Sequence, residues 1–189
     1  RLGLPVGILI CMAAFLIVPA ILVLVHYNQL VTLRNHIHNA WSHIDTELQR
    51  RYDLIPNLVA TVKGYASHER AVLERGVALR NQCAANRGSV AAQSRDETEL
   101  VAAMQRMFVV IEQYPQLKAD AHFLQLQQEL VNTEDRIQAA RRFFNGNVRD
   151  YKTKCQVFPS NLVAAMFGFG DENYFQVAPS VREVPDIEF

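Results

Sequence analysis

The chain has 189 residues, and its 19 lysine and arginine residues balance 19 aspartate and glutamate residues. This balance argues against a nucleic-acid-binding surface, because such a surface needs an excess of basic side chains to displace counterions from phosphates. Hydrophobic residues make up 50% of the chain and charged residues 20%, which excludes a disordered protein. Three cysteines, one of them necessarily unpaired within the chain, do not make a disulfide framework.

Residues 2–25 contain no charged side chain and are predicted to form a transmembrane helix. Such a helix would extend roughly 36 Å, and the hydrocarbon core of a bilayer is about 30 Å thick. A signal peptide is the alternative, but its apolar core is only about 7–15 residues long and ends at a small-residue cleavage site. This run is longer and ends in Leu24, Val25, His26 and Tyr27. We therefore predict that residues 1–25 are a retained anchor that contacts membrane lipid.

An apolar stripe with helical spacing follows the anchor. It consists of Leu30, Leu33, Ile37, Trp41, Ile44 and Leu48. No helix breaker separates the stripe from the anchor, so we predict one continuous helix that ends near Arg51 and Tyr52. Residues 53–56 are expected to form a turn and Pro56 to begin a second helix, because the residue before a proline avoids helical geometry. This second helix is predicted to end near Cys83.

Residues 84–93 are predicted to be a mobile loop, because they include Asn86 and Gly88. The third helix is expected to begin with a capping box. In this box Ser94 accepts a hydrogen bond from the backbone N–H of Glu97, and the Glu97 side chain reaches back. The helix is expected to end before Pro115.

The fourth predicted helix covers residues 117–157 and carries a seam with heptad-like steps of three and four. The seam consists of Phe123, Leu126, Leu130, Glu134, Ile137, Arg141, Phe144, Val148, Tyr151 and Cys155. We predict that its two charged members, Glu134 and Arg141, pair with polar side chains on neighbouring helices, such as Asn57, Arg50 or Asp45, and set the register of the bundle. The alternative is that the seam rotates and both side chains reach solvent.

The remaining elements are short. Ser160 is expected to cap a helix that continues to Met166, Gly168 and Gly170 are expected to end it, and the tail from Tyr174 is expected to be extended. The predicted fold is all-α: a transmembrane anchor (residues 1–25) continues into an antiparallel up-down bundle of long helices (residues 26–170), and a short extended C-terminal tail follows (residues 171–189).

No catalytic, cofactor-binding or metal-binding residue is predicted. His36 and His43 are seven residues apart, whereas metal-binding pairs on one helix are usually three or four apart. His68 and Glu69 would begin a zinc-protease motif, but Val72 stands where the second histidine is needed. We therefore expect no cofactor and no enzymatic activity.

Three segments carry a resemblance to a known family. Residues 27–69, 141–169 and 174–189 resemble the LemA family of bacterial proteins, and the resemblance is weakest between residues 82 and 97. It implies a single-pass protein of the bacterial inner membrane with a bundle of long helices. It supplies no catalytic residue. The association of some members with membrane stress responses and membrane proteases is a hint about partners.

The first expected function is a membrane-anchored scaffold or adaptor that acts through protein–protein contacts or self-association. Its partners would be copies of itself or a membrane protein such as a membrane protease. A stress-sensing or signal-relay module is the alternative. An uncharacterised enzyme ranks last, because no convergent set of polar groups can be assembled from the sequence. Arg1 and Arg34 flank the anchor too evenly to fix its orientation, and an extracytoplasmic soluble domain is the favoured expectation.

Overall fold

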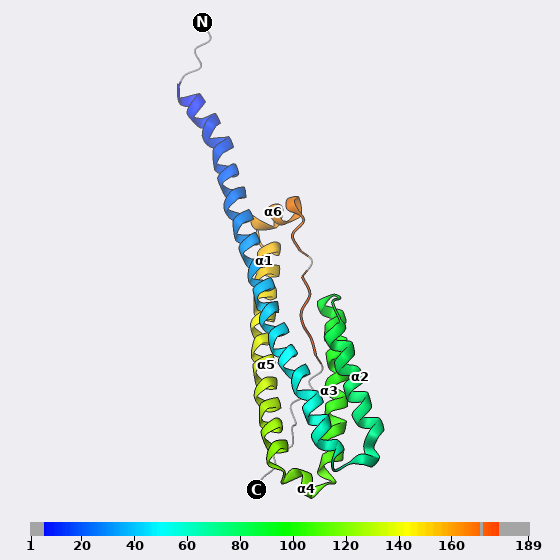
Figure 1. The fold of residues 1–189 in the computed structure, drawn as a ribbon. Coiled ribbons are helices and arrows are strands. Elements are labelled where there is room, and N and C mark those ends of the chain that lie inside the picture. The colour runs from blue at the N-terminus through cyan, green and yellow to red at the C-terminus, as the bar shows by residue number, and fades with distance from the viewer. Residues whose placement is uncertain (1–5, 171, 178–189) are drawn as a thin grey trace. The chain divides into compact units, whose positions relative to one another are not determined.

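The computed structural model describes residues 6–170 and 172–177. Its elements are α1 (Val6–Lys63), the 3-10 turn η1 (Ser67–Glu69), α2 (Arg70–Ala85), α3 (Val90–Glu112), α4 (Pro115–Lys118), α5 (Ala121–Gln156) and α6 (Ser160–Phe167) (Figure 1). The described residues form no strand, so the all-α prediction is confirmed.

The chain divides into two compact units, and α1 and α5 each contribute to both. The first unit consists of Arg1–Asn39 and Gly146–Glu172, and the second of Ala40–Asn145 and Asn173–Phe189.

The first part of α1 has the properties expected of a membrane helix. It is the one helix in the described part of the chain that is long and apolar enough to cross a bilayer, and none of its most apolar stretch is buried. Phe15, for example, is 79% exposed. A core helix of a water-soluble protein would bury these side chains, so their exposure favours lipid as their surroundings.

The predicted turn at residues 53–56 is wrong, because α1 continues through Pro56 to Lys63. A proline inside a helix lacks the N–H that would donate to the carbonyl four residues earlier, here that of Tyr52. Arg80 of α2 replaces this donor, and its Nε lies 2.8 Å from the Tyr52 carbonyl oxygen. Beyond Tyr52 the buried side chains of Ile55, Leu58 and Val62 anchor the extra turns, so tertiary packing outweighs the local preference of the proline.

The second unit has its apolar core where α1, α2, α3 and α5 meet. Its buried members include Leu58, Val62, Leu73, Met107, Ile111, Leu117, Phe123 and Leu130. In Figure 1 α2 and α3 lie side by side, and Gly76 permits their close approach. A Cβ at Gly76 would lie 3.0 Å from both Sδ and Cε of Met107.

The loop before α3 covers residues 86–89 and is shorter than the predicted 84–93, and the predicted capping box is wrong. The helix begins at Val90, and Ser89 caps it by accepting a hydrogen bond from the backbone N–H of Ala92 at 3.3 Å. Ser94 therefore lies inside the helix, and Glu97 faces the protein interior with no exposed surface. The helix ends at Glu112, close to the predicted end before Pro115.

The seam of α5 faces inward over much of its length, and Ile137, Phe144 and Val148 are buried. The helix begins at Ala121, and Asp120 caps it by accepting a hydrogen bond from the N–H of Phe123 at 2.9 Å.

At α6, the expectation that Ser160 is the N-cap is wrong. Ser160 is the first helical residue, and its hydroxyl donates to carbonyls of the preceding turn, including that of Val157 at 2.9 Å. Gly168 ends α6 in a left-handed conformation, with φ of 70°. Residues 172–177 are neither helix nor strand, and the rest of the predicted tail lies outside the described residues.

The role of Arg80 can be tested with a double-mutant cycle. We expect Arg80→Met to cost about 1 kcal/mol of unfolding free energy, because it leaves the Tyr52 carbonyl without a donor. In a Pro56→Ala background, where residue 56 can donate to that carbonyl, the same substitution should cost less. Urea unfolding of the full chain in mild detergent, followed by circular dichroism, measures both values.

Arg75 of α2 is a matched control, because it is 59% exposed and forms an ion pair with Glu99 at the surface. Arg75→Met should change stability by no more than about 0.5 kcal/mol in either background. If Arg80→Met cost the same unfolding free energy with and without Pro56, the Arg80 side chain would not be replacing the backbone N–H that the proline lacks.

Candidate functional site

The most unusual feature of the second unit is an arginine in its interior. Arg51 of α1 is only 2% exposed and lies between two carboxylates. Its Nη2 donates to Glu97 of α3, and its Nη1 donates to Glu134 of α5 at 3.0 Å. Three helices therefore meet at one guanidinium group. We call Arg51, Tyr52, Gln93, Glu97 and Glu134 the central cluster.

The carboxylate of Glu97 is fully satisfied by neighbouring donors. The hydroxyl of Tyr52 donates to its Oε1, and Nε2 of Gln93 lies 3.2 Å from the same oxygen. The same Nε2 also lies 3.0 Å from the Tyr52 hydroxyl oxygen. A buried carboxylate persists only when it is paired and hydrogen-bonded, and these contacts supply both requirements.

The electrostatics of the cluster raise the pKa values of Arg51 and Tyr52. Burial alone would lower the pKa of Arg51, but the charges of Glu97 and Glu134 outweigh it and raise that pKa. Burial, and secondarily Glu97, raise the pKa of Tyr52 above its ordinary value and the pKa of the nearby Cys83 thiol to about 12. Cys83 is thus protonated at neutral pH, which removes the thiolate that a cysteine nucleophile needs.

Of the two charged seam residues predicted from the sequence, Glu134 belongs to this cluster and Arg141 lies beside it. Glu134 pairs with Arg51, which is one residue after the Arg50 named among its expected partners. Gln138 also donates to Glu134, at 3.2 Å. Arg141 donates from Nη1 to Gln138 Oε1 at 3.4 Å. Burial lowers the pKa of Arg141 from its ordinary value, and Glu134 acts in the opposite direction. That these residues set the register of the bundle remains a prediction.

Arg141 also begins a second set of contacts, with the extended residues 173–177, which we call the strap. Its Nη2 donates to the Val177 carbonyl at 3.2 Å, and its guanidinium carbon lies 5.7 Å from the centre of the Phe175 ring. The Asn145 side chain pairs with the backbone of Phe175 twice: Nδ2 donates to the carbonyl at 3.0 Å, and Oδ1 accepts from the N–H at 2.9 Å.

Phe175 is the apolar anchor of the strap. Its ring is fully buried and packs edge-to-face against Trp41 with 5.3 Å between ring centres. The hydroxyl of Ser94 donates to the carbonyl of Gln176, the next residue of the strap. The strap is therefore held by side chains from α1, α3 and α5, the same three helices that meet at Arg51.

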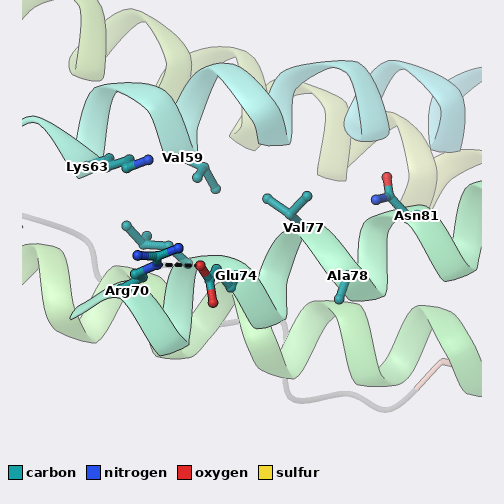
Figure 2. A pocket seen from close by; sticks show the side chains of 8 residues that line it. Val59, Lys63, Arg70, Glu74, Val77, Ala78 and Asn81 are labelled. Atoms are coloured by element: carbon teal, nitrogen blue, oxygen red, sulfur yellow. Dashed lines mark hydrogen bonds and ion pairs between the residues drawn. The ribbon is translucent and has the colours of Figure 1, made fainter. Parts of the chain in front are cut away.

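Two surface hollows lie near these residues. One, of about 300 Å³, exposes an edge of the central cluster and is lined by Asp45, Thr46, Gln49, Tyr52, Cys83, Arg87 and Gln93. The other, of about 420 Å³, lies between α1 and α2 (Figure 2). Its lining includes one carboxylate, Glu74, which is paired with Arg70. Neither hollow presents a nucleophile with an adjacent base, the arrangement typical of covalent catalysis.

Comparison with known proteins gives a family. A sequence model of the LemA family matches residues 40–189, a range that contains the central cluster, Arg141, Asn145 and the strap. The chain belongs to the LemA family. The matched range begins after the exposed apolar part of α1.

Individual relatives of this LemA-family chain have low sequence identity, but their matches cover most of the chain. Magnetosome protein MamQ 2 of Paramagnetospirillum magneticum is 25% identical over 182 residues, which cover 83% of this chain and 67% of the relative. Magnetosome protein MamQ of Magnetospirillum gryphiswaldense is 23% identical with the same coverage. Protein LemA of Metamycoplasma hominis is 25% identical over 155 residues, covering 82% of this chain and 71% of the relative. None of these names states an enzymatic activity.

The central cluster leads to a stability prediction. Glu97→Gln should lower the unfolding free energy by about 3–5 kcal/mol, because it removes one partner of a buried ion pair and leaves Arg51 undercompensated. Glu99→Gln is the matched control on the same helix, since Glu99 is 56% exposed and should contribute no more than about 0.5 kcal/mol. Chemical unfolding of the full chain in mild detergent measures both. Similar stabilities for the two variants would disprove the ion-pair interpretation.

The strap leads to a second prediction. Asn145→Ala removes both hydrogen bonds to the Phe175 backbone, so the amide of Phe175 should exchange with deuterium faster than in the parent. Asn132→Ala, at an exposed position of the same helix, should leave that exchange unchanged. Hydrogen–deuterium exchange with mass spectrometry measures the peptide that contains the strap. Unchanged protection in Asn145→Ala would show that the strap does not depend on the hydrogen bonds from Asn145.

Proposed function

We propose that this LemA-family chain is a membrane-anchored helical scaffold that acts by binding other membrane proteins or copies of itself. The observation that carries the proposal is the composition of α1. This single helix bears an apolar stretch near its N-terminus, none of whose most apolar part is buried, and core residues of the bundle further along, from Leu30 to Val62. The element that would cross the bilayer is thus also a core element of the folded domain.

The interior of the second unit supports a structural rather than a catalytic role. Arg51 forms ion pairs with both Glu97 and Glu134, and the pKa values of Arg51, Tyr52 and the nearby Cys83 are all raised further above neutrality. General acid–base catalysis instead requires a group whose pKa lies near the working pH. Among the described residues, no group of three or more histidine, cysteine, aspartate or glutamate side chains is placed to hold a metal ion.

The anchor is tested by placing charges in it. Leu16 and Leu22 are exposed apolar residues of α1, so replacing both with arginine leaves the core intact but adds a large cost of insertion, about 2.5–3.5 kcal/mol for each charge at the centre of a bilayer. The parent should stay with membranes after alkaline carbonate washing, and Leu16→Arg/Leu22→Arg should be released. The control is Val109→Arg/Leu124→Arg, at two exposed apolar positions of α3 and α5, which should stay with membranes.

The scaffold role is tested on the parent protein extracted in mild detergent. Its native mass should correspond to several copies of the chain, or to the chain with one reproducible membrane-protein companion. Release of both the parent and Leu16→Arg/Leu22→Arg by alkaline carbonate washing would contradict the anchor. If the parent stays with membranes but is a monomer without a companion in detergent, the scaffold proposal is contradicted and the anchor proposal is not.

A further inference from the structure

The first unit has a second apolar surface, at α6. Leu162 and Met166 lie four residues apart on one face of this helix and are 58% and 69% exposed. Val163 and Ala164, on the other face, are buried. Phe158, just before the helix, is 79% exposed. We call Phe158, Leu162, Met166 and Phe167 the α6 apolar face. Large side chains gathered in this way usually mark a surface that contacts a partner or a membrane.

Aromatic contacts attach this helix to α1 at the end of the apolar stretch. Tyr27 packs edge-to-face against Phe167, with 4.9 Å between ring centres, and against Phe169, with 5.6 Å. The guanidinium carbon of Arg34 lies 5.3 Å from the centre of the Phe169 ring. Tyr27 follows the last apolar residue, Val25, at the depth where a membrane–water interface is expected. The α6 apolar face therefore lies beside the point where α1 would leave the bilayer.

The orientation of α6 also fits a lipid surface. In Figure 1 α6 lies crosswise to α1, as expected of a helix in the plane of an interface when α1 crosses the bilayer.

We propose that α6 is a second membrane-binding element, which inserts its apolar face into the same leaflet that α1 enters at Val25. This inference rests on the proposed anchoring of α1. Lipid is the favoured occupant because the apolar face adjoins the exposed apolar stretch of α1 through Tyr27 and so extends the surface that already faces the bilayer. Insertion to a depth of about 5–10 Å is typical of interfacial helices. The contact ties both α1 and the end of α5 to the membrane surface.

Tryptophan fluorescence can test this in the full chain. The parent has one tryptophan, Trp41, which lies roughly 24 Å beyond Val25 along the axis of α1. Leu162→Trp and Met166→Trp each add a second tryptophan on the α6 apolar face. Asn39→Trp adds one at an exposed position of α1 in the same unit. The proteins are reconstituted into phosphatidylcholine–phosphatidylglycerol vesicles with or without bromine on the lipid acyl chains. Flotation and circular dichroism confirm insertion and folding.

We expect brominated lipid to quench the added fluorescence of Leu162→Trp and Met166→Trp several-fold more than that of Asn39→Trp. Equal quenching in all three, in proteins that float with the vesicles, would overturn the α6 contact and leave the anchor intact. Weak quenching of Leu162→Trp and Met166→Trp, together with crosslinking of residue 162 to residue 162 of a second copy, would overturn the lipid contact and indicate that α6 binds another copy of the chain. A parent chain that does not float would overturn the anchor itself, and the α6 proposal with it.

Discussion

The buried charge of Arg51 constrains the whole second unit. A guanidinium group removed from water loses several kcal/mol of solvation free energy and persists only with well-placed carboxylates. Here the carboxylates come from α3 and α5, while the arginine comes from α1. Moving any of these helices by one turn, about 5.4 Å, would separate the charges. We therefore expect the ion pairs to contribute chiefly by penalising wrong alignments, since buried ion pairs add little net stability compared with apolar side chains of similar size.

Other contacts in the unit depend on the same alignment. Tyr52 follows Arg51 and joins three helices: its hydroxyl contacts Glu97 of α3, and its carbonyl accepts a hydrogen bond from Arg80 of α2. The second contact exists because Pro56 leaves that carbonyl without a helical donor. On α5, Arg141 lies close enough to Glu134 to balance the second carboxylate and also holds the strap. The ion pairs and the strap therefore depend on one arrangement of α1, α3 and α5.

Much of this fold could be predicted from apolar spacing, because spacing reports which face of a helix is buried. The stripe of α1 and the seam of α5 identified buried residues such as Ile44 and Phe144. The errors came from local signals that tertiary contacts outweigh. Pro56 indicated a turn, but Arg80 and the apolar core hold the helix together. Ser94 and Glu97 matched a capping box, but Ser89 caps the helix and Glu97 pairs with Arg51.

The missed residues do leave a signal in the sequence. Arg51 falls between Leu48 and Ile55 at steps of three and four, so it occupies a position of the apolar stripe once α1 is allowed to continue. Glu97 precedes Leu100 by three residues and stands at an equivalent position on α3. Glu134 was recognised by this same criterion. An unpaired charge on the buried face of a helix has a high desolvation cost. One arginine and two glutamates on the buried faces of three neighbouring helices are therefore expected to pair with one another. The sequence did not predict this pairing, because the predicted helix ends placed Arg51 at the end of the first helix and Glu97 in a capping box, and not on buried helix faces.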